Sequence, residues 1–127
     1  KQLKRAGLDY WHDVNIIHHA DLAAFLDYLG DRQLYLITKF ADRIYSEADF
    51  TKDEDTFFIF GKETTGLPES FMQENAEKCL RIPMNDKHVR SLNLSNTACM
   101  VVYEALRQQG FPNLELTHTY ENDKLKG

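Results

Sequence analysis

Polar side chains that could bind a ligand are concentrated in one short stretch of the sequence. Carboxylate, amide, hydroxyl and basic groups fall within residues 85–93, at Asn85, Asp86, Lys87, His88, Arg90, Ser91 and Asn93. The stretch follows a predicted strand that ends with Ile-Pro-Met at 82–84. In open α/β folds, ligands bind where strands end, so these residues form the first candidate site.

The segment after this loop is predicted to be a long helix with one apolar face. Its apolar residues recur at steps of three and four positions, at Leu94, Ala98, Val101, Val102, Ala105 and Leu106. Gly110 and Pro112 should end the helix. A rigid helix would then hold the polar loop against the end of a strand.

The rest of the chain alternates between strands and helices. We expect strands at 14–17, 34–38, 56–60 and 80–84, helices at 1–6, 21–29 and 69–78, and a connection at 41–50. The uninterrupted apolar runs at 34–38 and 56–60 are typical of strands inside a parallel sheet. The order of elements predicts an α/β fold with a mostly parallel sheet flanked by helices.

Length and composition restrict the class of protein. The 127 residues, 43% of them hydrophobic, suffice for one globular domain with a core. No apolar run approaches the roughly 20 residues that cross a bilayer, so we expect no membrane association. Cys79 and Cys99 are expected to be reduced core thiols, which fits a cytoplasmic protein. The net charge of -5 argues against a protein that coats nucleic acid, but it leaves local basic patches open.

The sequence lacks the residues that several common enzyme chemistries require. Gly61 and Gly66 have the spacing of a phosphate loop, but the Leu-Pro that follows replaces the required Lys and Ser or Thr. Gly61 is therefore interpreted as a turn that lets the backbone approach a ligand. His18 and His19 directly follow the strand predicted at 14–17, and adjacent residues of an extended chain point to opposite faces, so we expect no metal site. An enzyme with this sequence would transfer a group directly between two bound molecules.

Three ordered motifs resemble the SPOUT (SpoU–TrmD) RNA methyltransferases. They are Phe-Gly-Lys-Glu-Thr-Thr-Gly at 60–66, Ile-Pro-Met at 82–84 and Ser-Leu-Asn-Leu-Ser-Asn at 91–96. Within this superfamily the sequence is similar to the tRNA (cytidine/uridine-34) 2′-O-methyltransferase subfamily. The resemblance covers about residues 1–116, which we expect to form a single domain before a flexible tail at 117–127.

The resemblance implies a fold, a cofactor and a pocket. The fold is the SPOUT fold, an α/β sheet whose C-terminal segment forms a deep trefoil knot. The cofactor is S-adenosyl-L-methionine. By resemblance, the backbone at Ile37, Gly61 and Ile82 and the turn at Ser91 and Leu92 would line its adenosine pocket.

The resemblance also implies a homodimer, with the long C-terminal helix in the interface. Met100, Tyr103 and Leu106 are the candidates for that contact. The alternative is an ordinary core stripe along the same helix, and one helix can serve both purposes.

The implied reaction is attack by a ribose 2′-hydroxyl of the wobble nucleotide, in the tRNA anticodon loop, on the methyl group of the cofactor. We expect catalytic roles for Tyr103 and Arg5, and substrate contacts from Lys39 and Arg90. Arg5 and Lys39 suit phosphate contacts. Arg90 would hold the substrate or the cofactor carboxylate, and Tyr103 would orient the hydroxyl or a group of a partner subunit.

One part of the family pattern is absent from the sequence. The family has about one strand-plus-helix unit before the point where this chain starts, with an Asn-Thr-Gly-Asn-x-x-Arg stretch whose Arg is a candidate for activating the hydroxyl. We therefore expect either a longer natural protein or an inactive form. The alternative function is a non-catalytic RNA-binding or dimerisation module that keeps the knot.

Overall fold

The computed structural model describes residues 15–52, 54–62, 65–84 and 93–126. The chain divides into two compact units, Lys1–Asp31 and Arg32–Gly127. No helix within the described residues is both long and apolar enough to cross a membrane.

The first unit contains the helix α2, Leu22–Leu29. Asp21 caps its start, because the side chain accepts a hydrogen bond from the Ala24 N–H at 2.8 Å. The helix predicted at 21–29 is thereby confirmed. The strand predicted at 14–17 is wrong at its described positions, 15–17, which are neither helix nor strand.

The second unit is built on a parallel sheet. Its described strands are β1 (Gln33–Ile37), β2 (Thr56–Phe60) and β3 (Cys79–Leu80), in the order β2-β1-β3. Ile37 at the end of β1 lies opposite both Phe60 and Leu80, so all three strands end at the same edge. The strands predicted at 34–38 and 56–60 and the parallel architecture are confirmed.

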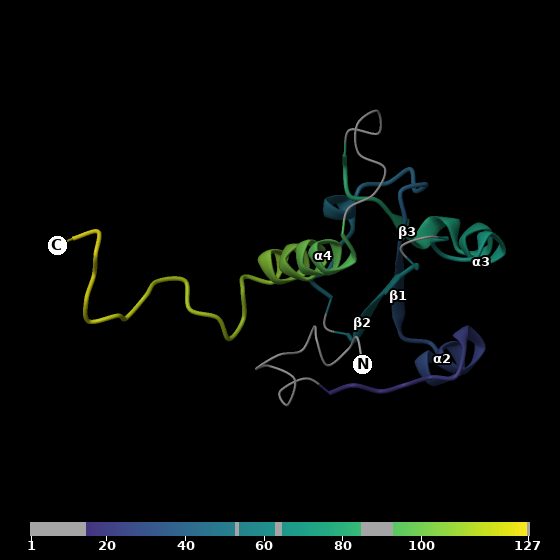
Figure 1. Ribbon diagram of the computed structural model, residues 1–127, viewed down its shortest axis with the longest axis horizontal. Helices are drawn as coiled ribbons and strands as arrows, with labels where there is room; N and C mark the ends of the chain where they lie inside the picture. The colour runs from purple at the N-terminus through teal and green to yellow at the C-terminus, as the bar shows by residue number, and fades with distance from the viewer. Residues whose placement is uncertain (1–14, 53, 63–64, 85–92, 127) are drawn as a thin grey trace. The chain divides into compact units, whose positions relative to one another are not determined.

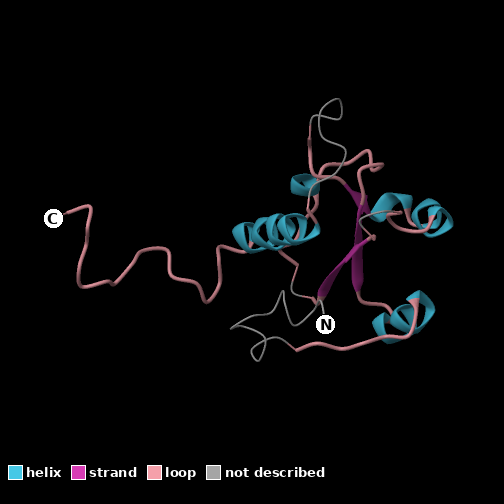
Figure 2. Ribbon diagram, viewed as in Figure 1, coloured by secondary structure: helices cyan, strands magenta, loops and turns pink. Residues whose placement is uncertain are grey.

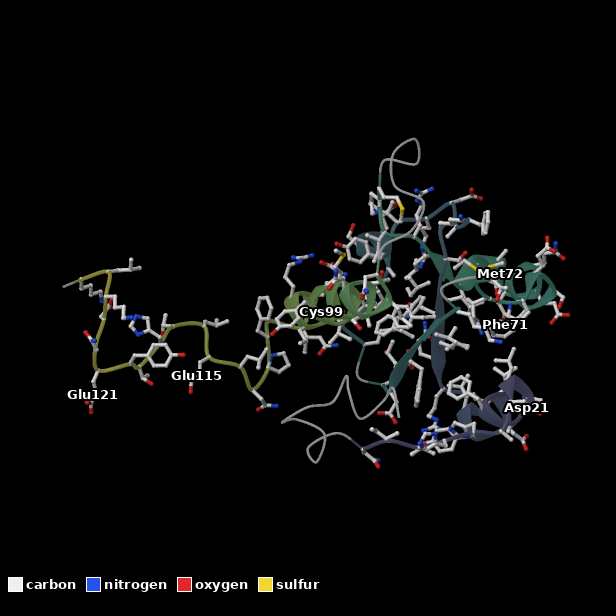
Figure 3. All side chains as sticks on the ribbon, in the orientation of Figure 1. Asp21, Phe71, Met72, Cys99, Glu115 and Glu121 are labelled. Carbon is white, nitrogen blue, oxygen red and sulfur yellow. The ribbon has the colours of Figure 1, made fainter. Side chains whose placement is uncertain are left out.

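Helices α3 (Glu69–Glu74) and α4 (Leu94–Gln108) lie on opposite sides of this sheet (Figures 1 and 2). Phe71 is the buried residue of α3, and Cys99 marks α4 on the other side (Figure 3). Asn93 caps α4, because its side chain accepts hydrogen bonds from two N–H groups of the first turn. Gly110 follows the helix with a φ of 81°, as expected from its place in the sequence.

The core between the sheet and α4 is a single apolar cluster. Its buried members are Tyr35, Ile37, Ala48, Phe50, Leu80, Ile82 and Val101. Among the described residues Phe50 has the largest fully buried side chain, and its ring meets Tyr35 and Phe58 edge-on, each at a centroid distance of 5.3 Å. The predicted connection at 41–50 therefore supplies the centre of the core.

Two glutamines at the end of α4 fix this connection. Gln108 accepts a hydrogen bond from the Phe50 N–H at 2.8 Å and donates one to the Ala48 carbonyl at 3.0 Å. Gln109 donates to the Phe50 carbonyl at 2.8 Å. A half-buried backbone group left without a partner costs about 1–3 kcal/mol, so these bonds hold the Phe50 segment on the helix.

Glu104 lies one turn before Gln108 and is also held by hydrogen bonds. Its two oxygens accept from the Arg107 Nε at 2.9 Å and Nη2 at 3.0 Å, and Gln108 Nε2 donates to it at 2.7 Å. The bond from Arg107 lowers the pKa of Glu104 most, partial burial opposes it, and Gln108 and the charge of Arg107 lower the pKa further. The net effect is a carboxyl group with a lowered pKa.

We expect Glu104 to stabilise the fold at neutral pH and to lose this effect in acid. A lowered pKa in the folded state means that its stabilising effect is complete above the pKa of the unfolded chain. The effect then disappears as the pH falls through the folded-state pKa. The free energy of unfolding, measured with urea, should differ most between the wild type and Glu104→Gln at neutral pH. This difference should shrink as the pH falls below the ordinary range of glutamate pKa values. Glu121→Gln, on the exposed tail (Figure 3), is the matched control; an unchanging Glu104→Gln difference across this range would contradict the prediction.

Several predicted boundaries are wrong. The helix predicted at 69–78 ends at Glu74, and after Asn75 a short 3-10 turn, η3 (Ala76–Lys78), leads into the sheet. The strand predicted at 80–84 is short and begins one residue earlier, at Cys79. Both cysteines are free, but Cys99 is exposed rather than in the core.

The apolar stripe predicted on α4 is only partly buried. Val101 is completely buried and Ala105 packs against the core, whereas Leu94 and Val102 are 36% and 45% exposed. Successive residues of a helix are about 100° apart around its axis, so Val101 and Val102 cannot both face the sheet. The helix therefore has a second apolar surface outside the core.

Candidate functional site

The parallel sheet brings the predicted cofactor residues Ile37, Gly61 and Ile82 to one edge. Ile37 is the last residue of β1, Gly61 follows β2 directly, and Ile82 comes shortly after β3. Ser91 and Leu92, predicted for the same pocket, lie outside the described residues, as do Arg5 and Arg90.

The side chains of Ile37 and Ile82 point into the core. They are 8% and 7% exposed, and both belong to the cluster around Val101. A ligand at this edge would therefore meet their main chain, which is the kind of contact predicted for them.

A further extended segment continues the sheet beyond β3. Ile44 forms a parallel bridge with Arg81. The Arg81 N–H donates to the Arg43 carbonyl at 2.9 Å, and the Tyr45 N–H donates to the Arg81 carbonyl at 2.8 Å. After β1, the chain therefore runs beside Arg81, the residue that follows β3, and is hydrogen-bonded to it. The short 3-10 helix η2 (Tyr45–Glu47) comes next.

Gly61 has an internal reason to be glycine. A Cβ built on it would lie 2.3 Å from the Gly66 carbonyl carbon and 2.4 Å from the Leu67 nitrogen. The loop closes on itself here, because the Gly66 N–H donates to the Lys62 carbonyl at 2.8 Å. The sequence suggested that Gly61 lets a ligand approach; in the structure, the backbone of its own loop already uses that space.

The remaining described candidates, Lys39 and Tyr103, are both exposed. Lys39 lies in the turn after β1, with its ammonium nitrogen 5.4 Å from the centroid of the Phe40 ring. Tyr103 lies on α4, 53% exposed, and its ring is 6.5 Å from that of Phe111 beyond the end of the helix. Because Val101, two residues earlier, faces the core, Tyr103 points away from the sheet rather than toward Ile37.

Sequence reasoning gave no role to Phe40 or Arg43. Both lie in the same turn as Lys39, and Phe40 is 72% exposed. The available signal was an aromatic residue placed between two basic ones directly after a strand.

The sequence matches a known protein family. Residues 1–103 match the model of the SpoU rRNA Methylase family. The chain is 41% identical over 117 residues to the tRNA (cytidine(34)-2'-O)-methyltransferase of Escherichia coli (strain K12), covering 91% of the chain and 73% of the relative. A Lactococcus lactis subsp. cremoris protein provisionally given the same name is 62% identical over 128 residues, or 99% of the chain and 76% of the relative.

Solved structures resemble it as well. One, described as giving structural insights into the 2-OH methylation of C/U34 on tRNA, matches with a TM-score of 0.75 and 37% identity, over 86% of this chain and 69% of that one. An AdoMet-bound rRNA methyltransferase from Sinorhizobium meliloti matches with a TM-score of 0.58 and 25% identity, over 68% of this chain and 33% of that one.

Proposed function

The chain belongs to the SpoU rRNA methylase family, and we propose that it is an S-adenosyl-L-methionine-dependent tRNA 2′-O-methyltransferase that acts on the wobble nucleotide, cytidine 34. The observation that carries this proposal is the 41% identity to the Escherichia coli enzyme over an alignment that covers 91% of the chain. We further propose that residues 1–116 act as one SPOUT domain with the trefoil knot, and that the protein works in the cytoplasm.

The proposed cofactor site is the edge where the three strands end. The main chain at Ile37, Gly61 and Ile82, with Ser91 and Leu92, would hold the adenosine. The side chains of Ile37 and Ile82 are buried in the core, so their main chain is what this edge presents to the adenosine, which supports this assignment. When bound, S-adenosyl-L-methionine supplies an electrophilic methyl group and is released as S-adenosylhomocysteine.

The protein's own task is to position the ribose and to take up a proton. The 2′-hydroxyl oxygen forms a bond to the methyl carbon as the carbon–sulfur bond breaks, and the hydroxyl proton must leave. We assign Lys39 to a tRNA phosphate, Arg90 to the substrate or cofactor carboxylate, and Arg5 and Tyr103 to the reacting groups. Tyr103 points away from the sheet of its own chain, so it would serve the site of a partner subunit.

A homodimer through α4 is part of the proposal. Of the predicted interface residues, Met100 and Tyr103 are 40% and 53% exposed, and Leu106 is half-buried. Val102, which was not predicted for the interface, is 45% exposed on the same helix. Contact with a second copy would remove these apolar side chains from water, at about 25 cal/mol for each Å² of apolar surface buried. The same contact would bring Tyr103 to the neighbouring site.

Methyl transfer to tRNA tests the function. The protein is incubated with tRNA and cofactor labelled in the methyl group, and nuclease digestion locates the label. We expect 2′-O-methylcytidine at position 34 and no transfer to a tRNA with 2′-deoxycytidine there, because that tRNA lacks the attacking hydroxyl. Calorimetric binding of S-adenosylhomocysteine without any transfer would instead favour the non-catalytic RNA-binding module.

Tyr103→Phe then tests the role of its hydroxyl. If Tyr103 orients the 2′-hydroxyl or passes on its proton, kcat should fall while binding of S-adenosylhomocysteine stays unchanged, because the ring that packs in the dimer is retained. Full turnover would remove Tyr103 from the chemistry.

A further inference from the structure

We propose that the turn formed by Lys39, Phe40 and Arg43 binds RNA, with Phe40 stacked on an unpaired base beside the target nucleotide and the two basic residues on neighbouring phosphates. This inference rests on the proposed function and adds a part of the protein that recognises the substrate.

Phe40 is unusually exposed for its size. At 72% it is the most exposed large apolar side chain among the described residues up to the end of α4. Single exposed apolar side chains are common on proteins, so exposure alone does not indicate a role. The position and surroundings of Phe40 make it informative.

The turn that carries Phe40 is anchored at both ends. On one side, the Thr38 N–H donates to the Leu80 carbonyl at 2.9 Å, and the Thr38 hydroxyl oxygen accepts from the Phe40 N–H at 3.3 Å. On the other side, the Arg43 carbonyl accepts from the Arg81 N–H at 2.9 Å. Between them Ala41 is buried, with 8% exposure. A ring presented on such a turn loses little conformational freedom when a partner stacks on it.

The edge around Phe40 is basic although the chain has a net charge of -5. Among the described residues at 38–44, 61–62, 65–66 and 81–84, the basic side chains are Lys39, Arg43, Lys62 and Arg81, and Asp42 is the acidic one. Basic side chains contribute the sequence-independent part of nucleic-acid binding by contacting phosphates. Lys39 also lies 5.4 Å from the Phe40 ring centroid, so the turn joins a cation to an aromatic face.

The location favours RNA over other partners. Phe40 lies three residues after Ile37, whose main chain we assign to the cofactor pocket, so a base beside the reacting ribose would arrive near it. Anticodon loops present bases without a pairing partner, and proteins read such bases by stacking them on aromatic rings. Each such stack contributes about 1–3 kcal/mol and tolerates any base, because every base has an aromatic face.

The test combines RNA affinity with a stacking signal. An anticodon stem-loop carrying 2-aminopurine beside position 34 is titrated at fixed salt with the wild type, Phe40→Ala, Phe40→Leu and Phe40→Trp. Stacking quenches 2-aminopurine, so we expect quenching with the wild type and Phe40→Trp, and its loss with the other two variants. The RNA Kd of Phe40→Ala should rise about 5- to 150-fold, the equivalent of one stack.

Three controls separate this inference from structural damage. Phe40→Ala should keep the melting temperature and the affinity for S-adenosylhomocysteine. Tyr120→Ala, which removes a 78% exposed ring from the tail, should leave RNA affinity unchanged. Lys39→Ala and Arg43→Ala should each lower the slope of log K against log salt by about one.

Unchanged RNA affinity in Phe40→Ala, or equal quenching by Phe40→Leu and the wild type, would overturn the inference. A wild type that binds the stem-loop but transfers no methyl group would refute the proposed function, while the Phe40 comparison still decides the stacking. A wild type that binds no RNA would refute both.

Discussion

Gly61→Ala is expected to weaken cofactor binding severely and to slow methyl transfer. The new Cβ would lie 2.3 Å from the carbonyl carbon of Gly66, and atoms of this kind essentially never approach closer than 3.0 Å. The atoms it meets are backbone, so no side-chain rotation can relieve the contact and the loop at Gly66–Leu67 must move as a whole. Overpacking of this kind costs about 1–3 kcal/mol or more. Because the loop borders the proposed pocket, calorimetry should show an affinity for S-adenosylhomocysteine at least about 100-fold weaker, or about 2.7 kcal/mol.

Gly110→Ala is the matched control for this prediction. Gly110 has a φ of 81°, so alanine there is strained by about 1–2 kcal/mol, but nothing lies within 4 Å of the added carbon. We expect a lower melting temperature with unchanged affinity for S-adenosylhomocysteine. If Gly61→Ala binds the ligand as well as Gly110→Ala does, the loop does not form part of the pocket.

Phe50→Ala is expected to cause the largest loss of stability. Phe50 is 1% exposed and meets Tyr35 and Phe58 edge-on, so its removal leaves a cavity between the sheet and α4. Changes of a buried Phe to Ala cost about 3–5 kcal/mol. That is a large part of the about 5–15 kcal/mol that holds a domain folded, so the variant should be partly unfolded at 37 °C. Urea unfolding measures the loss.

Phe40→Ala is the matched comparison for Phe50→Ala, because both residues lie in the segment between β1 and β2. Its ring is 72% exposed, so we expect a change within about 0.5 kcal/mol in the free energy of unfolding. The two substitutions should therefore affect different properties: Phe50→Ala should lower stability, and Phe40→Ala should lower RNA affinity. A loss below about 1 kcal/mol in Phe50→Ala would contradict the position assigned to its ring.

Local patterns in the sequence were enough to predict much of the fold. The apolar runs predicted β1 and β2, and Asp21 predicted the start of α2. The end of the helix predicted at 69–78 was wrong because it depends on one side chain: the Asn75 amide donates to the Phe71 carbonyl at 2.9 Å. Such a bond competes with continued helix, and apolar periodicity does not reveal it.

Contacts between distant parts of the chain could not be predicted in the same way. The strand order β2-β1-β3 places Ile37 between Gly61 and Ile82 at the edge where the strands end, and single-strand patterns do not specify that order. The resemblance identified these residues, but it could not reveal that Phe50, from an irregular connection, fills the core. Nor could it distinguish the exposed Phe40 from the buried Phe50, because both are aromatic residues outside strands.

The two glutamines at the end of α4 make the hydrogen bonds that a neighbouring strand would otherwise make. Ala48 has extended backbone angles. Without the two glutamines, the peptide groups from Ala48 to Phe50 would be available to pair with a strand of another molecule. Gln108 takes up one N–H and one carbonyl with a single amide, as a strand residue would, and Gln109 takes up a second carbonyl. The helix thereby shields an edge of the kind through which proteins aggregate.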